Sequence, residues 1–114
     1  MGKLFEIIDK TGKKIHLSEE RYKHIQKHPY MHDSLETIKR AIQNPTTMRH
    51  NEEDDTVVFF YREIKENNPP ERYLFVSVKY LNGEGFIITS FYTNRITGSK
   101  WKIWAYIMMM KETT

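Results

Sequence analysis

Cysteine is absent from the 114-residue sequence. Without thiols the chain forms no disulfide, carries no cysteine nucleophile and builds no cysteine-based zinc or iron site. Its chemistry must therefore come from other side chains. A chain of this length buries enough core to fold without such cross-links, and we predict a single domain over residues 1–114.

Long apolar runs are also missing. No stretch approaches the ~18 apolar residues of a membrane span, and the segment Met1–Leu4 lacks the apolar block of a signal peptide. We therefore expect no membrane partner and a cytoplasmic location.

Neither sign of charge is strongly in excess, although bases outnumber acids. Lys and Arg total 18, Asp and Glu total 15, and the net charge is +3. Four of the acids form the run Glu52–Asp55, which is typical of a solvated turn, so the remaining surface is more basic than the total suggests. Such a surface suits a polyanionic partner such as RNA.

Turn and capping residues divide the first half of the chain into a hairpin and a helix. Leu4–Ile8 and Ile15–Leu17 flank the pair Thr11-Gly12 and predict two short antiparallel strands. Ser18 is a helix N-cap, and the helix must end near Lys27 because the following Pro29 disfavours helical backbone before it.

A second helix should begin after Asp33 or Ser34. Leu35, Ile38 and Ile42 give it an apolar stripe, and Asn44-Pro45 stops it. Beyond it, β-branched and aromatic residues predict strands at 56–62, 72–81 and 85–93, with a further short strand possible at 46–50. We therefore predict an α+β fold, in which the N-terminal hairpin and two helices pack on one face of an antiparallel sheet of three to four strands.

The last two predicted strands form a hairpin closed by Asn82-Gly83. A two-residue turn predicts the cross-strand pairs Lys79–Phe86, Ser77–Ile88, Phe75–Ser90 and Tyr73–Tyr92, all on one face. The other face then carries Leu74, Val76, Val78, Ile87, Thr89 and Phe91, and as the more apolar set it should pack on the helices. The face left exposed is aromatic, hydroxylated and basic.

An apolar tail follows at 99–114, with Trp101, Trp104 and three consecutive methionines. We expect it to close the core as a last strand or helix, or alternatively to form an interface with a partner.

Three histidines recur at four-residue spacing: His24, His28 and His32, with Lys27 among them. Imidazole accepts or donates a proton near neutral pH, as RNA transesterification requires, and nearby cations would stabilise charge on the phosphate. A simpler interpretation is that these are exposed residues complementing the dipole at a helix end. A metal site is a third interpretation, but Pro29 separates His32 from the helix and no acidic ligand stands beside it.

The predicted sheet supplies a second set of candidates. Tyr73, Phe75, Phe86 and Tyr92 would stack bases, while Arg62, Lys79 and Arg95 would contact phosphates. Tyr92 or Ser90 would orient the scissile phosphate. Alternatively these aromatic residues belong to an ordinary two-sided sheet and lie beneath the C-terminal tail.

The segment His24-Ile25-Gln26-Lys27-His28-Pro29, a helix ending at Asn44-Pro45, three strands and the run Ile87–Tyr92 together resemble a known group of proteins. They are similar to the phage-associated nucleases grouped with barnase, EndoU, colicin and RelE ribonucleases (the BECR fold) and, more loosely, to BrnT toxins. The resemblance runs from about Leu17 to Tyr92. It implies a small metal-independent ribonuclease whose sheet cradles RNA, with His24, His28 and Thr89 as site residues.

We therefore hypothesise a metal-independent endoribonuclease of toxin or effector type that needs no cofactor. The predicted catalytic residues are His24, His28, Thr89, Ser90 and Tyr92, and the predicted RNA-binding residues are Lys27, Arg62, Lys79 and Arg95. Expected partners are RNA, a protein antitoxin or inhibitor, and a second copy of the chain. The alternatives are a catalytically inert RNA-binding domain and a protein-interaction module.

Overall fold

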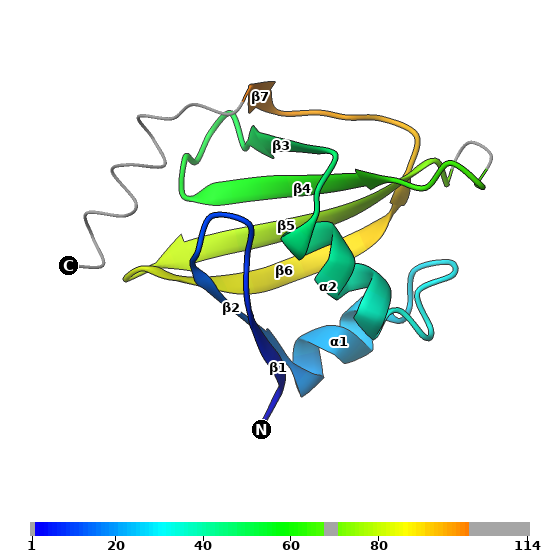
Figure 1. Ribbon diagram of the computed structural model, residues 1–114. Coiled ribbons are helices and arrows are strands. Elements are labelled where there is room, and N and C mark those ends of the chain that lie inside the picture. The colour runs from blue at the N-terminus through cyan, green and yellow to red at the C-terminus, as the bar shows by residue number, and fades with distance from the viewer. Residues whose placement is uncertain (1, 68–70, 101–114) are drawn as a thin grey trace.

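Two helices cover one face of a seven-stranded mixed sheet in the computed structural model (Figure 1). The structure describes residues 2–67 and 71–100, without the side chain of Lys100. The sheet order is β1-β2-β6-β5-β4-β3-β7. The strands are β1 (Lys3–Ile8), β2 (Lys14–Ser18), β3 (Thr47–His50), β4 (Val57–Glu63), β5 (Tyr73–Leu81), β6 (Glu84–Thr93) and β7 (Ser99–Lys100), and the helices are α1 (Glu19–Ile25) and α2 (Leu35–Gln43).

The N-terminal hairpin forms as predicted, with β1 and β2 antiparallel. Its turn is built on Asp9, whose Oδ1 accepts hydrogen bonds from the backbone N–H and hydroxyl of Thr11 and from the backbone N–H of Lys13. Gly12 has a φ of +92°, a conformation that glycine adopts without steric cost. A short polar sequence thus closes the hairpin with local hydrogen bonds.

Both helices lie close to their predicted positions. The Ser18 hydroxyl accepts a hydrogen bond from the Arg21 backbone N–H, as an N-cap does. α1 ends at Ile25, two residues before the predicted end at Lys27. In α2, Ile38, Ala41 and Ile42 are buried, which confirms the apolar stripe.

The sheet is larger than predicted and is mixed. β2 pairs in parallel with β6, from Lys14↔Glu84 to His16↔Phe86, so the hairpin belongs to the main sheet. β3 and the short β7 extend the opposite side. Ile15 and Leu17 of β2 are fully buried, which explains this joining: their apolar side chains are covered by the helices only if β2 lies beside β6.

The core lies between the helices and one face of the sheet, here called the helix face. Tyr22, Ile25, Ile38, Ala41 and Ile42 from the helices meet Ile15, Leu17, Val58, Phe60, Leu74, Val76, Val78 and Ile87 from the strands. The predicted inward set on β5 is therefore correct.

The predicted register of the β5–β6 hairpin is wrong beyond Ile87. The pairs Lys79↔Phe86 and Val78↔Ile87 are followed by Ser77↔Thr89, because a β-bulge inserts Ile88 without a partner. A one-residue bulge reverses the faces of every later side chain in its strand. Ser90 and Tyr92 therefore turn to the helix face, where the sequence pattern had placed Thr89 and Phe91.

The opposite face of the sheet carries a cluster of aromatic rings. Phe75 lies in ring contact with Phe59, Tyr61 and Phe91, with centroids 4.7 to 5.2 Å apart. Residues 94–98 lead from β6 to β7, and the Tyr61 hydroxyl meets the hydroxyl and backbone N–H of Thr97. Because Tyr61 and Phe75 are buried, the broad exposed aromatic face expected from the sequence is not present there.

Two expectations from the sequence concern a membrane and the tail. Within the described residues, no helix is long and apolar enough to cross a membrane. The predicted apolar tail begins with β7, and its remainder, 101–114, lies outside the described residues, as does 68–70.

Candidate functional site

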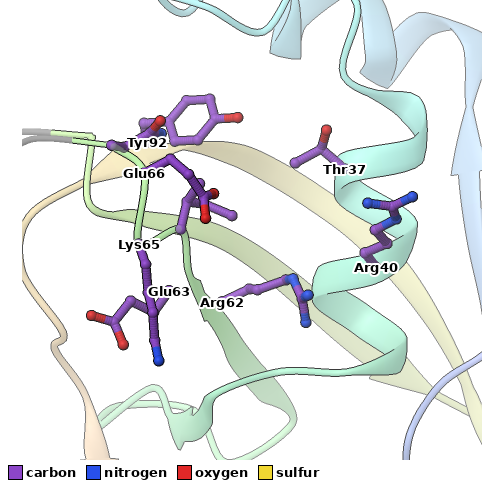
Figure 2. Close-up of a pocket in the computed structure, with 9 residues that line it drawn as sticks. Thr37, Arg40, Arg62, Glu63, Lys65, Glu66 and Tyr92 are labelled. Carbon is purple, nitrogen blue, oxygen red and sulfur yellow. The ribbon is translucent and has the colours of Figure 1, made fainter.

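Three adjoining pockets surround Tyr92 at one end of the sheet. They measure about 470, 350 and 360 Å³ and share lining residues with one another. Together they form one depression, which we call the Tyr92 groove; Figure 2 shows the residues of its largest pocket. Its walls come from four parts of the chain: His28, Pro29 and Tyr30 after α1; Thr37 and Arg40 of α2; Arg62 to Asn67 and Glu71 around the β4–β5 connection; Phe91 and Tyr92 of β6.

Tyr92 is the residue common to all three pockets. The bulge at Ile88 turns its ring to the helix face, where the ring packs against the core. Burial raises the pKa of the Tyr92 phenol above its ordinary value, so the hydroxyl stays protonated at neutral pH. Figure 2 shows this hydroxyl directed into the space between α2 and the strands. Within the described residues, no hydrogen bond to this hydroxyl is found.

Three cationic side chains line the largest of the three pockets, together with Glu63 and Glu66. Arg40 comes from α2, Arg62 from β4 and Lys65 from the segment after β4 (Figure 2). Arg62 Nη1 donates a hydrogen bond of 2.7 Å to the carbonyl of Asn44, which caps α2, and this fixes the guanidinium beside the helix end. Arg40 is exposed and makes no side-chain hydrogen bond or ion pair with the described part of the chain. Guanidinium groups in this position suit a phosphate.

His28 lies at the other end of the groove. Within β6, only Glu84–Phe86 pair with β2, so the later half of β6 is flanked by α1 and by the residues that follow it. The His28 ring lies 5.2 Å from the Phe91 ring, centroid to centroid, and is exposed. The turn holding it is anchored by Met31, which is fully buried and donates its backbone N–H to the His28 carbonyl.

Three of the predicted site residues thus line one groove: His28, Arg62 and Tyr92. Predicted residues outside its lining include His24, exposed on α1, and Lys27, exposed in the turn after it. Arg95 is exposed in the segment 94–98, two residues after β6 ends. These three are surface positions that the structure does not bring into the groove.

The two predicted hydroxyl residues of β6 lie elsewhere. Ser90 is fully buried, and its Oγ donates a hydrogen bond of 2.7 Å to the Phe75 carbonyl. This hydroxyl is therefore engaged in holding β5 to β6. Thr89 is half-buried opposite Ser77, on the face away from the helices.

Lys79 lies at the far end of the sheet. It pairs with Val57 at the start of β4, and the groove lies at the end of that seven-residue strand, about 20 Å away. Its Nζ forms a 2.7 Å ion pair with Asp54 Oδ2. The hydrogen bonds from Lys79 and Thr56 lower the pKa of the Asp54 carboxyl to about 2. Lys79 is thus already neutralised by the protein.

The sequence had not singled out Tyr30, Thr37, Arg40, Lys65, Glu66 or Glu71 as groove residues. The spacing of two of these residues in the sequence was informative: Thr37 and Arg40 are three residues apart and so share one side of α2. Which strand ends that side would face depends on how α2 packs on the sheet, and helical periodicity does not contain this information.

One group of side chains within residues 2–67 and 71–100 has the spacing of metal ligands. Glu6, His16 and Glu84 place ligand atoms within 4.8 Å of one another. His16 is buried; its Nε2 contacts the Glu84 carboxylate and its Nδ1 lies 3.3 Å from Glu6 Oε2. The His16 hydrogen bond lowers the pKa of the Glu84 carboxyl. The ammonium groups of Lys3 and Lys14 lie 3.5 and 3.8 Å from Glu6 and balance the carboxylates, as in an ion-pair network joining β1, β2 and β6.

Comparison of the chain with known protein families, curated proteins and solved structures finds no match. Fold and groove together define a small α+β domain with a groove at one end of a mixed sheet, lined by cationic, acidic and aromatic side chains.

Proposed function

We propose that the protein is a metal-independent endoribonuclease and that the Tyr92 groove is its active site. One observation carries the proposal: a histidine, a partly buried tyrosine and two arginines, from four separate segments, line the same groove. Proton-transfer groups and guanidinium cations are the parts needed for RNA transesterification, and Tyr92 borders both the arginine-lined pocket and the pocket that contains His28. The family resemblance read from His24 to Tyr92 supports the same activity.

In the proposed reaction, His28 acts as the general base. Its imidazole takes the proton of a ribose 2'-hydroxyl, and the 2' oxygen attacks the adjacent phosphorus. The bond from phosphorus to the 5' oxygen breaks, and that oxygen takes the proton of the Tyr92 hydroxyl. A 2',3'-cyclic phosphate and a free 5'-hydroxyl result. Arg40 and Arg62 stabilise the negative charge that grows on the phosphate, and solvent returns the proton from His28 to Tyr92.

Cleavage of total RNA in the presence of EDTA tests this proposal. His28→Ala should lower the rate by about 10²- to 10⁴-fold, the usual contribution of a general base. His24→Ala is the matched control, because His24 is an exposed histidine of the same segment and lies outside the groove lining. RNA that stays intact under every condition, or an equal loss of cleavage rate in His28→Ala and His24→Ala, would refute the assignment.

A catalytically inert RNA-binding domain is the second candidate. It is favoured by the burial of Ser90, which removes one predicted phosphate-orienting hydroxyl from the groove. Such a domain would bind RNA with an affinity that falls steeply with salt, and would release it intact. A mobility-shift assay run beside the cleavage assay separates the two functions.

The biological setting is proposed from the resemblance alone. It implies a toxin, phage protein or effector domain, for which a protein antitoxin or inhibitor is a partner to be tested. A homodimer remains a prediction, to be tested by sedimentation of the full chain.

A further inference from the structure

The pocket of about 350 Å³ at the His28 end of the groove differs in its lining from the pocket that contains the arginines. His28, Pro29, Tyr30, Phe91 and Tyr92 give it a mostly aromatic lining, and Glu71 is its one carboxylate. Flat walls of this kind accommodate a flat, aromatic ligand. The pocket adjoins the part lined by Arg40 and Arg62, since Tyr92 borders both.

Tyr30 occupies an unusual backbone conformation at the mouth of this pocket. Its φ is +66°, a region that favours glycine and is rare for a bulky residue. The turn is needed to bury Met31, but glycine or asparagine would make that turn at lower cost. The Tyr30 side chain does not offset this strain by packing against the core, because it is 73% exposed. Strained residues of this kind occur at ligand sites, and an exposed ring beside a pocket is a stacking surface.

Glu71 gives the pocket a chemical preference. Its carboxylate makes no hydrogen bond or ion pair with the described residues; its backbone carbonyl alone accepts, from Asn67 Nδ2. An ionised carboxylate only accepts hydrogen bonds. It therefore favours a base edge with an amino group, as on adenine, cytosine and guanine. Uracil carries carbonyl oxygens on both sides of its N3–H, and these would be repelled.

We propose that this pocket binds one unpaired nucleobase bearing an exocyclic amino group, stacked on Tyr30 and recognised by Glu71, next to the phosphate held by the arginines. The inference rests on the proposed function, because it assigns the base specificity of the same groove. Tyr30 and Glu71 are then specificity residues that take no part in proton transfer.

The experiment uses short 2'-deoxy oligonucleotides of dA, dC or dU, which lack the 2' nucleophile and so report binding without cleavage. Calorimetry on the full chain should show dA and dC binding about tenfold more tightly than dU. Tyr30→Ala should weaken binding of dA and dC by about tenfold, within the range found for loss of base stacking, and Tyr30→Phe should retain it. Glu71→Gln should abolish the preference, because an amide both donates and accepts.

Tyr30→Gly separates a ligand role from a structural one. Glycine relieves the positive φ, so this variant should melt at or above the wild-type temperature while its base binding falls as in Tyr30→Ala. A lower melting temperature with unchanged binding would overturn the proposal.

Running the cleavage assay in parallel distinguishes the two proposals. RNA cut equally after all four bases, with Tyr30→Ala fully active, refutes the base pocket and leaves the ribonuclease standing. Base-selective binding that depends on Tyr30 and Glu71, with no cleavage, refutes the ribonuclease and leaves the pocket. Absence of both binding and cleavage refutes both.

Discussion

Lys79 and Arg40 lie near opposite ends of the central strands and differ in whether a charged partner holds them. At the end where β4 begins, Lys79 is paired with Asp54, which also accepts two hydrogen bonds from Thr56. At the end where β4 stops, the exposed Arg40 lines a groove without a charged partner in the described part of the chain. The contrast concerns Lys79 and Arg40, since Glu63 at the second end is paired with Arg72. Under the proposed function, the first end serves the fold and the second binds a ligand.

The largest expected effect is the loss of RNA cleavage when the groove loses its arginines. Arg40→Ala combined with Arg62→Ala should lower the rate by about 10³-fold, or about 4 kcal/mol, because both guanidiniums would face the charge that develops on the phosphate. Lys79→Ala is the matched control and should cleave RNA at nearly the wild-type rate, since its cation lies at the other end. If Lys79→Ala instead lowers the rate of RNA cleavage more than the double arginine variant does, the contrast between the two ends is reversed.

A stability measurement probes the opposite end next. Gly85 lies where β2, β5 and β6 meet, and an added Cβ would clash with Ile15 Cδ1 and lie 2.8 Å from Val78 Cγ1. Both neighbours are fully buried core side chains, so Gly85→Ala should lower the free energy of unfolding by about 2 to 3 kcal/mol. Urea unfolding checks this value. Thr37→Ala in the groove wall should change it by less than about 0.5 kcal/mol, and a comparable loss there would show that the groove residues also maintain the fold.

Local signals in the sequence predicted the elements well, and the arrangement that makes the site was only partly accessible to them. Ser18, Thr11-Gly12 and Asn44-Pro45 act on the backbone within a few residues, so their positions define strand and helix ends. The β2–β6 pairing joins segments about 70 residues apart, and neither strand alone specifies the direction of its partner.

Tyr92 was predicted as a site residue from an incorrect geometry, and it nevertheless lines the groove. The sequence pattern placed it on an exposed face beside Ser90, with strict alternation along β6. The bulge at Ile88 has no proline or glycine to mark it, yet it turns Tyr92 toward α2 and Arg40. Without that extra residue, Phe91 would occupy the helix face and the groove would have no hydroxyl at its centre. The sequence does not mark Arg40 as a groove residue either, because an arginine on the outer side of an amphipathic helix is ordinary.

The smallest expected effect tests whether the Lys79 end is only structural. The pKa of Asp54 is about 2, below its ordinary value of 3.8, because the Lys79 ammonium and Thr56 donate hydrogen bonds to the carboxylate. A lowered pKa in the folded state adds stability that is fully present above about pH 4 and is lost as the pH falls toward 2. Since the Asp54 side chain is 41% exposed, we reduce the full effect of such a shift to about 1 kcal/mol. Asp54→Asn should therefore have a free energy of unfolding about 1 kcal/mol below that of the wild type at pH 7, and this difference should close between pH 4 and pH 2.

Glu71→Gln, at the groove end, should show no such difference in the free energy of unfolding at any pH. If Asp54→Asn instead leaves stability unchanged and slows RNA cleavage, the Lys79–Asp54 pair belongs to the functional surface and the division between the two ends of the sheet fails.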